Sequence, residues 1–278
     1  MDLRLNKILI KTKKQVFSEI SGDNISPLKG DGYDFAELRE YEVGDDVKKI
    51  DWAISAKMHK PYVKIFHAQR KLNIAVASLL SGSTYFGSNE LFKNELIATI
   101  VAILGYSTLK QNDNFISLIA SDSTHIINQK FNSKHSIKKA VQTILEYDIL
   151  GKQINYKNMF DDIYKILKKR TILFLVGDFI NIDSSSLKLL SKKYEVVAII
   201  VRDKFEEEPS ALGSISLQDP ATHQRFDGVV SQKSLINYTK ELKAQDDILY
   251  KELHKNQIRY TKIYTDEDPF IKLKKLFL

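Results

Sequence analysis

A cluster of hydroxyl-bearing residues follows an apolar stretch in the sequence VASLLSGSTYFGS at residues 76–88. In α/β domains, ligands are held in the loops beyond the carboxyl ends of the strands. Ser81, Ser83 and Thr84 would bring three hydroxyl groups to such a loop, here called the serine loop (residues 79–87). Hydroxyl oxygens can ligate a hard cation such as Mg²⁺, or act as nucleophiles when a base activates them. The stretch contains no carboxylate, so it lacks the negative charge that a divalent cation prefers.

No catalytic pattern surrounds these hydroxyl groups. The stretch lacks the glycines that a G-x-S-x-G nucleophile elbow places two positions before and after one serine. The six histidines are scattered without paired spacing, and neither a P-loop nor a G-x-G-x-x-G pattern occurs. The chain has no cysteine, which excludes thiol nucleophiles, disulfides and thiolate metal sites. We therefore expect a protein that is not an enzyme.

Apolar runs alternate with amphipathic stretches from residue 72 onward, which predicts parallel strands joined by crossover helices. The expected strands are 72–80, 115–121, 171–179, 196–203 and 258–264. The expected helices are 89–110, 133–147, 156–170, 184–193, 234–256 and 269–278. Together they predict an α/β fold with a doubly wound, mostly parallel sheet of five or six strands, of the Rossmann type, over residues 72–278.

Residues 1–71 lack this alternating pattern and are expected to form an N-terminal extension. A helix is predicted at about residues 3–20, and a stretch rich in turn-forming residues follows it. Residues 62–69 alternate in part, as an antiparallel strand or hairpin arm does. Because no long low-complexity linker separates the extension from the sheet, we expect it to pack against the sheet.

Composition limits the partners. With 278 residues and 43% hydrophobic content, the chain can bury a full core. Its longest apolar run, residues 96–106, is about half of what a membrane-spanning helix needs, so we expect a soluble, cytoplasmic protein without membrane insertion. The net charge of +7 comes from lysines spread in short pairs with acids between them, so we expect no nucleic-acid partner. A nucleic-acid-binding protein remains a less favoured alternative.

The most specific pattern lies in residues 30–57, GDGYDFAELREYEVGDDVKKIDWAISAK. Together with the serine loop and residues 196–224, it makes the chain resemble the bacterial domain-of-unknown-function family 58 over nearly its whole length. Members of that family carry a von Willebrand factor A-like domain, which the resemblance therefore implies here. The positions that match at the family's spacing are Gly30, Phe35, Arg39, Tyr41, Gly44, Asp45, Asp46, Ile50, Asp51, Trp52 and Ser55.

The resemblance implies a metal-ion-dependent adhesion site at the serine loop, because the family's loop has the pattern D-x-S-x-S. Ser81 and Ser83 match the two serines, whereas Leu79 stands in place of the aspartate. Asp178 matches the second acidic group of the fold. With one acid instead of two, the site is degenerate and we expect no metal cofactor, with Asp178 accepting hydrogen bonds from loop amides or serine hydroxyls. Weak Mg²⁺ binding by Ser81, Ser83 and Asp178 is the alternative.

The matching segment also contains a glycine followed by two aspartates, Gly44, Asp45 and Asp46. The glycine suits a positive φ, and either aspartate can cap a short helical turn. Arg39 has a planar guanidinium that could form a two-point ion pair with Asp45 or with Asp51.

Trp52, the single tryptophan, is expected to act as an anchor that buries its large ring. One interpretation of the segment is a packing and capping module. The other is a surface shown to a partner, with Arg39, Asp46 and the pair Lys48 and Lys49 as exposed contacts.

The function that the resemblance implies is a partner or adaptor role. Members of the family are typically encoded beside MoxR-type AAA+ ATPases, so we expect a protein-interaction module that works with such an ATPase in chaperone-like assembly of client proteins. The partner-binding loop would be the serine loop with Ser81, Ser83, Thr84 and Asp178. An adhesion-type binder that uses weakly held Mg²⁺ at the same loop is the alternative.

Overall fold

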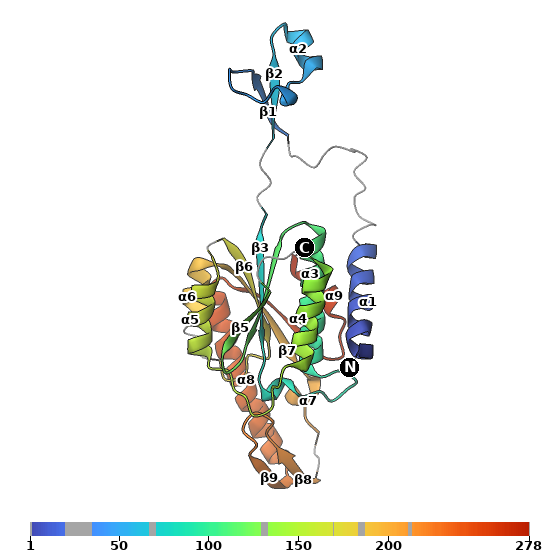
Figure 1. Cartoon of the computed structure of the whole chain (residues 1–278). Helices are drawn as coiled ribbons and strands as arrows, with labels where there is room; N and C mark the ends of the chain where they lie inside the picture. Colours follow the sequence, from blue (N-terminus) through green and yellow to red (C-terminus); the bar gives the residue numbers. More distant parts are fainter. Residues whose placement is uncertain are drawn as a thin grey trace. The chain divides into compact units, whose positions relative to one another are not determined.

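The computed structural model describes residues 2–19, 35–66, 71–128, 133–168, 170–182, 187–210 and 213–277. The chain divides into two compact units (Figure 1). The sheet unit comprises Met1–Ile20 and Leu72–Leu278, and the small unit comprises Ser21–Lys71. Within the described ranges, no helix has the length and apolar character needed to cross a membrane.

The sheet unit is built on six strands in the order β10-β7-β6-β3-β4-β5. Their bounds are β3 (Asn73–Leu79), β4 (Asn114–Ala120), β5 (Thr124–Asn128), β6 (Thr171–Gly177), β7 (Glu195–Arg202) and β10 (Arg259–Tyr264). All neighbours pair in parallel except β5, which runs antiparallel to β4 at one edge. The five strands expected from the sequence are confirmed. β5 was not predicted, because this edge strand is partly exposed and its sequence has no continuous apolar run.

Helices cover both faces of this sheet, which confirms the expected doubly wound α/β fold (Figure 1). One face carries α3 (Lys93–Lys110), α4 (Lys134–Glu146) and α9 (Pro269–Phe277). The other face carries α5 (Tyr156–Ile166), α6 (Leu187–Lys193) and α8 (Gln232–Lys255). Each face has its own hydrophobic cluster, because successive side chains of a strand point to opposite sides of the sheet.

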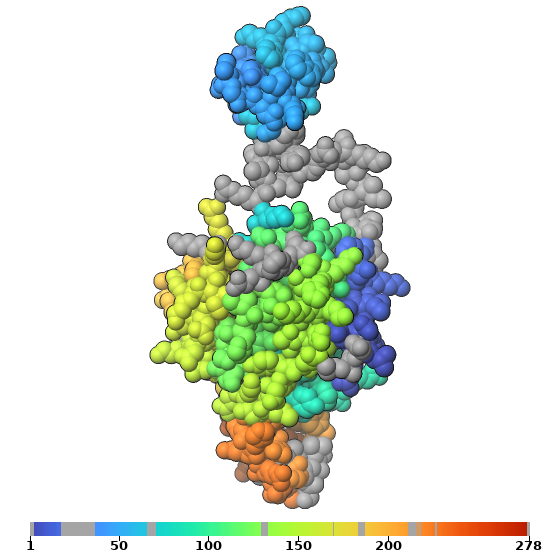
Figure 2. All heavy atoms as spheres, viewed as in Figure 1, coloured from blue at the N-terminus to red at the C-terminus, as the bar shows by residue number. Residues whose placement is uncertain are grey.

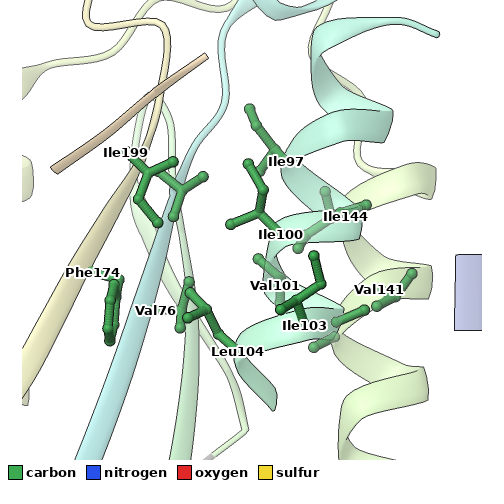
Figure 3. Close-up of a cluster of buried hydrophobic side chains, with 14 of the residues drawn as sticks. Val76, Ile97, Ile100, Val101, Ile103, Leu104, Val141, Ile144, Phe174 and Ile199 are labelled. Carbon is green, nitrogen blue, oxygen red and sulfur yellow. The ribbon is translucent and has the colours of Figure 1, made fainter. Parts of the chain in front are cut away.

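The core of the first face lies between the central strands and α3 (Figure 3). Val76, Phe174 and Ile199 project from β3, β6 and β7 toward Ile100 and Leu104 of the helix. The three strand residues are at most 4% exposed. Burial of one such side chain stabilises a fold by about 1.5–3 kcal/mol, so this layer fixes α3 on the sheet.

The N-terminal helix α1 (Asp2–Glu19) belongs to the sheet unit. It contacts α3 and α4, and its apolar residues Leu5, Leu9 and Val16 join the same hydrophobic cluster. At its start, Arg4 Nη1 lies 2.5 Å from Glu95 Oε1 of α3. The expected extension of residues 1–71 is therefore divided between the two units. The apolar side of α1 is buried against α3, whereas the segment from Ser21 to Lys71 forms the small unit.

The small unit contains an antiparallel hairpin and two short helices. β1 (Phe35–Glu40) pairs with β2 (Tyr62–Phe66), and η1 (Val47–Lys49) and α2 (Trp52–Met58) lie between them in sequence. β2 confirms the predicted hairpin arm, although the arm was expected to extend to residue 69 and residues 67–70 lie outside the described part of the chain.

A second hairpin was not predicted. β8 (Gly213–Gln218) and β9 (Arg225–Val230) are inserted between the short helix α7 (Lys204–Glu207) and α8. The turn between the two strands spans residues 219–224. It places an additional element beside the loops at the carboxyl ends of the strands.

The packing of α1 gives a test. We expect Leu5→Ala to lower the free energy of unfolding by about 2–4 kcal/mol, because Leu5 is 3% exposed and truncation leaves a cavity. Leu3→Ala in the same helix is the control, with an expected change within about 0.5 kcal/mol, since Leu3 is 87% exposed. Chemical denaturation measures both. Equal effects of the two substitutions would contradict the docking of α1 on the sheet unit.

Candidate functional site

The serine loop begins where β3 ends and turns through a short 3-10 helix, η2 (Gly82–Thr84). Ser81 Oγ and Ser83 Oγ lie 2.7 Å apart, within hydrogen-bond distance. The Thr84 hydroxyl donates to the Ser81 carbonyl oxygen at 2.7 Å, so it closes the turn from inside. The loop therefore contains one connected pair of hydroxyl groups, and Thr84 has a structural use.

Asp178 follows β6, the strand that pairs with β3, so its side chain reaches the serine loop. Ser83 Oγ donates to Asp178 Oδ2 at 2.5 Å, and the Ile180 amide donates to Asp178 Oδ1 at 3.4 Å. Asp178 is 1% exposed. The structure thus brings Ser81, Ser83 and Asp178 together, with the hydrogen bond between a serine hydroxyl and the carboxylate that the sequence predicts.

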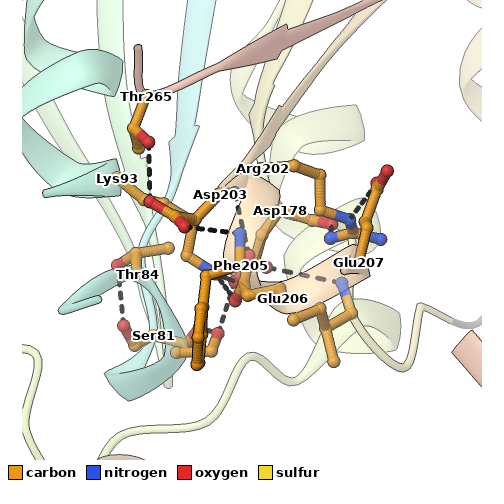
Figure 4. Close-up of polar contacts among 12 residues, drawn as sticks. Ser81, Thr84, Lys93, Asp178, Arg202, Asp203, Phe205, Glu206, Glu207 and Thr265 are labelled. Atoms are coloured by element: carbon orange, nitrogen blue, oxygen red, sulfur yellow. Dashed lines mark hydrogen bonds and ion pairs between the residues drawn. The ribbon is translucent and has the colours of Figure 1, made fainter. Parts of the chain in front are cut away.

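A lysine that the sequence analysis missed completes this cluster (Figure 4). Lys93 is the first residue of α3 and is 0% exposed. Its Nζ lies 3.2 Å from Asp178 Oδ2 and 2.5 Å from Glu206 Oε1. A buried cation at the positive end of a helix dipole needs anionic partners. The sequence signal for Lys93 was a lysine at the start of a predicted helix, where an acid is normally favoured.

The acidic turn after β7 supplies the second partner of Lys93. Asp203 caps α7 by accepting from the Phe205 amide at 2.9 Å, while Glu206 Oε2 accepts from the Asp203 amide at 3.0 Å. Asp203 also accepts from the Ser88 and Thr265 hydroxyls, both at 2.6 Å. From the sequence alone, the run of acids from Glu206 to Glu208 before Pro209 predicts a solvated turn, with a docking patch for a basic partner as the alternative. The structure corrects this for Glu206, because its carboxylate faces Lys93 and the cap of α7.

A second set of buried charges adjoins Asp178. Arg202, the last residue of β7, is 2% exposed, and its Nη1 donates to the Asp178 carbonyl oxygen. Its Nη2 lies 2.8 Å from Asp246 Oδ1 of α8. Burial alone would raise the pKa of Asp246, but attraction to Arg202 and Lys262 outweighs this and holds that pKa below its usual value.

Lys262 of β10 extends this second set toward α7. Its Nζ lies 3.1 Å from Asp246 Oδ2 and 2.6 Å from Glu207 Oε1. The Tyr264 hydroxyl donates to Glu207 Oε2 at 2.7 Å. Burial, and to a smaller extent this hydrogen bond, raise the pKa of Tyr264 to about 12. Glu207, like Glu206, therefore holds an internal position and is not simply a solvated acid.

The ionised form of Asp178 is favoured despite its burial. Burial would raise the pKa of this carboxyl group, yet the charge of Lys93, the Ser83 hydroxyl and the charge of Arg202 hold the pKa below its usual value. Asp178 is thus a carboxylate whose charge is balanced by side chains of the chain itself.

The residues at the serine loop do not fit a divalent cation well. Leu79, in the position of the family's aspartate, is 0% exposed and packs in the hydrophobic cluster of the α5 face. Asp178 Oδ2 already receives Ser83 Oγ and Lys93 Nζ. Among the residues that the structure describes, no group of three or more histidines or acids could hold a metal ion.

The turn of the β8–β9 hairpin lies against the serine loop. The Gly151 amide donates to the Pro220 carbonyl oxygen at 2.8 Å, and a Cβ atom added at Gly82 would come within 2.3 Å of the same oxygen. In Figure 2, the orange atoms of this hairpin and of α8 adjoin the yellow-green atoms around residue 150. The close approach depends on Gly82, because any side chain there would displace backbone.

The signature residues of the small unit form a compact set of caps. Gly44 has a φ of +113°, as the sequence predicts. Arg39 Nη2 lies 2.7 Å from Asp45 Oδ1, while Asp45 Oδ2 accepts from the Glu42 amide at 2.9 Å, so the expected ion pair has one contact instead of two. Asp46 caps η1 by accepting from the Lys48 amide at 3.0 Å.

Asp51 does not take part in the ion pair of Arg39 and instead caps a helix. It caps α2 by accepting from the Ala53 and Ile54 amides at 3.0 and 3.1 Å, and Lys64 Nζ lies 2.6 Å from its Oδ2. The hydrogen bond from Lys64 and those from the helix amides lower the pKa of Asp51. Of the matching positions, Gly30 lies outside the described residues.

Trp52 is 68% exposed, so the expectation that it would be buried as an anchor is wrong within the small unit. It is the first residue of α2, where the Asp51 cap directs the helix and leaves the ring outside the hairpin. Val43 and Val47 are also exposed. The small unit therefore shows apolar side chains, including a large aromatic ring, on a framework fixed by caps.

Comparison with known proteins extends the description. The family model described as "Protein of unknown function DUF58" matches residues 37–246. The uncharacterized protein Rv1480 of Mycobacterium tuberculosis is 24% identical over 236 residues, which cover 83% of this chain and 73% of that protein. The uncharacterized protein Mb1516 of Mycobacterium bovis matches with the same identity and coverage.

Two solved structures are similar to this chain at low sequence identity. The conserved hypothetical protein BatB from Bacteroides thetaiotaomicron is 11% identical, with a TM-score of 0.46, and the match covers 74% of this chain and 96% of that chain. An aerotolerance-related membrane protein from Bacteroides fragilis is 9% identical, with a TM-score of 0.44, covering 74% and 98%. Similarity at this level carries no information about activity.

The lowered pKa of Asp246 predicts a pH dependence. A carboxyl group whose pKa is lower in the folded state stabilises the fold above its unfolded pKa of about 3.9, and this stabilisation is lost as the pH falls through the folded pKa. At pH 7, we expect Asp246→Asn to lower the free energy of unfolding by about 3 kcal/mol. The difference from the wild type should shrink as the pH falls from 5 to 3.

Thermal unfolding as a function of pH measures this effect. Asp247→Asn is the matched control, because Asp247 is the next residue of α8 and is exposed. The control should change stability by less than about 0.5 kcal/mol at any pH. A penalty of Asp246→Asn that is independent of pH would show that the charge of Asp246 is not what stabilises the fold.

The contact of the hairpin turn with Gly82 gives a third prediction. Gly82→Ala should displace the turn, because the new Cβ would meet three backbone atoms of residues 220 and 221. We expect faster trypsin cleavage after Arg225, measured by limited proteolysis and mass spectrometry. Unchanged cleavage at this arginine would mean that the turn does not depend on the glycine.

Proposed function

This chain belongs to the DUF58 family, and from that premise we propose that it is a non-enzymatic protein-interaction module. The proposed partner is a MoxR-type AAA+ ATPase, with which the chain would act on client proteins during chaperone-like assembly in the cytoplasm. The resemblance of the signature and of the serine loop to family members encoded beside such ATPases supports this partner. The printed family description itself names no activity.

The observation that carries the interaction role is the exposure of Trp52. Within the small unit, Trp52 is 68% exposed and its large apolar ring is left uncovered by that unit, and such rings are enriched among the residues that dominate binding energy at interfaces. Its position at the start of α2 is fixed by the Asp51 cap. The backbone that carries the ring is thus already ordered, and a partner that covers the ring needs to order only its side chain.

The small unit also carries charged residues of the signature. Arg39 and Asp45 hold each other, so their charges are balanced. Lys48 and Lys49 belong to η1 and are exposed, with Asp46 as the cap of that helix. We therefore propose the signature surface as the main contact, in which the tryptophan provides area and the lysines provide attraction to an acidic rim.

The serine loop is the second proposed contact. Ser81 is only 7% exposed, and the Ser83 hydroxyl donates to Asp178, which limits what these hydroxyl groups can offer to a partner. The Mg²⁺-dependent alternative would need that carboxylate free of Lys93. We therefore rank the serine loop below the signature surface.

Binding measurements with the full chain test the proposal. A MoxR-type AAA+ ATPase from the same organism is immobilised, and the affinity of the wild type is compared with that of Trp52→Ala. We expect a loss of affinity of about 30-fold or more, as for truncation of an interface hot spot. Tyr238→Ala is the control, because Tyr238 is an exposed aromatic residue of α8 in the other unit.

The outcomes separate the two proposed contacts. Loss of binding on Trp52→Ala alone supports the signature surface. Loss on Ser81→Ala with Ser83→Ala, and not on Trp52→Ala, would assign the contact to the serine loop. No binding of the wild type to the ATPase would exclude this partner.

A further inference from the structure

The ammonium group of Lys93 lies at the centre of the acids and hydroxyls around the serine loop (Figure 4). Its Nζ is 3.2 Å from Asp178 Oδ2, which in turn accepts from Ser83, and Ser83 contacts Ser81. On the opposite side, Nζ is 2.5 Å from Glu206 Oε1. The same side chain therefore joins the end of β6 and the short helix α7 to the start of α3.

The site around Asp178 has room for one cation, and Lys93 is that cation. Asp178 and Glu206 are the two acids that contact Lys93, and Lys93 is 0% exposed, so water cannot screen the contact. A divalent ion on Asp178 Oδ2 would lie only a few ångströms from the ammonium group, because metal–oxygen distances are about 2 Å. Two positive charges at that separation in a buried site repel strongly.

We propose that Lys93 is a resident cation that takes the place of the divalent metal at this site. Lys93 then organises the serine loop through Asp178, as an ion would in a metal-dependent site, and it cannot dissociate. Leu79 fits this arrangement, because an acid at that position would add a third carboxylate to the two that Lys93 already balances. The site is permanently assembled and independent of Mg²⁺.

This inference goes beyond the proposed partner role and does not depend on it. It concerns how the loop is held together, whichever protein the chain binds. Its tests use metal binding and thermal stability, so a failure of the ATPase-binding experiment would leave it intact, and the reverse also holds.

The first experiment is a calorimetric titration of the full chain with Mn²⁺ after treatment with EDTA. We expect no saturable heat for the wild type and a shift in Tm of less than about 1 °C between EDTA and millimolar Mn²⁺. Saturable binding in the micromolar range that Asp178→Asn abolishes would overturn the proposal. This titration decides the matter without any variant of Lys93.

The second experiment replaces the cation. Lys93→Ala should lower Tm by at least about 5 °C, because it leaves Asp178 and Glu206 unpaired. Removing the ammonium group also opens room between two carboxylates and two hydroxyls, so Mn²⁺ should bind and restore more than half of the lost Tm. Lys204→Ala is the control, since Lys204 pairs with Asp266 at the surface. The Tm of this variant should equal that of the wild type and should not change with Mn²⁺.

A variant without charges covers the case in which Lys93→Ala does not fold. Lys93→Met combined with Asp178→Asn and Glu206→Gln removes the cation and both acids together. It should fold and should not respond to Mn²⁺, because no buried charge is left unpaired and no carboxylate remains at the site. A single variant Lys93→Ala that is as stable as the wild type in EDTA would contradict the proposal.

Discussion

The ion contacts of Lys93 are the constraint on which the centre of the sheet unit depends. The lysine begins α3, where the helix dipole opposes a positive charge, and it is fully buried. Such a position is stable only when acids meet it, and Asp178, directly after β6, and Glu206, in the short helix α7, do so. The serine loop, the end of β6 and the turn into α7 are consequently fixed by one ammonium group.

The neighbouring charges follow the same rule. Arg202, Asp246, Lys262 and Glu207 are each partnered by an opposite charge, and Arg202 also binds the backbone of Asp178. Removing one member would cost more than the whole set contributes, because an unpaired buried charge is left behind. The two sets connect β7, β10 and α8 to the serine loop through side chains, not through the main chain of the sheet.

Sequence patterns predicted what depends on periodicity. The five parallel strands were recognisable because strands covered on both faces have nearly continuous apolar runs. Asp178 was assigned to the serine loop by the family resemblance, and the parallel pairing of β3 with β6 explains why its side chain reaches that loop. The pairing of Lys93 with residues 85 and 113 positions away could not be predicted, since no local pattern marks such partners. The exposure of Trp52 was likewise missed, because hydrophobicity alone favours burial over a docking role.

The layering around α3 determines how the sheet unit opens. α3 packs on the sheet with one side and contacts α1, α4 and α9 with others, and most of its residues are buried. α1 lies outermost and shows Leu3 and Ile10 to solvent. We therefore expect the amide hydrogens of α1 to exchange with water through local opening, and those of α3 to stay protected until larger parts of the sheet unit open. The helix that carries the buried lysine is thus also the helix whose backbone hydrogen bonds we expect to open last.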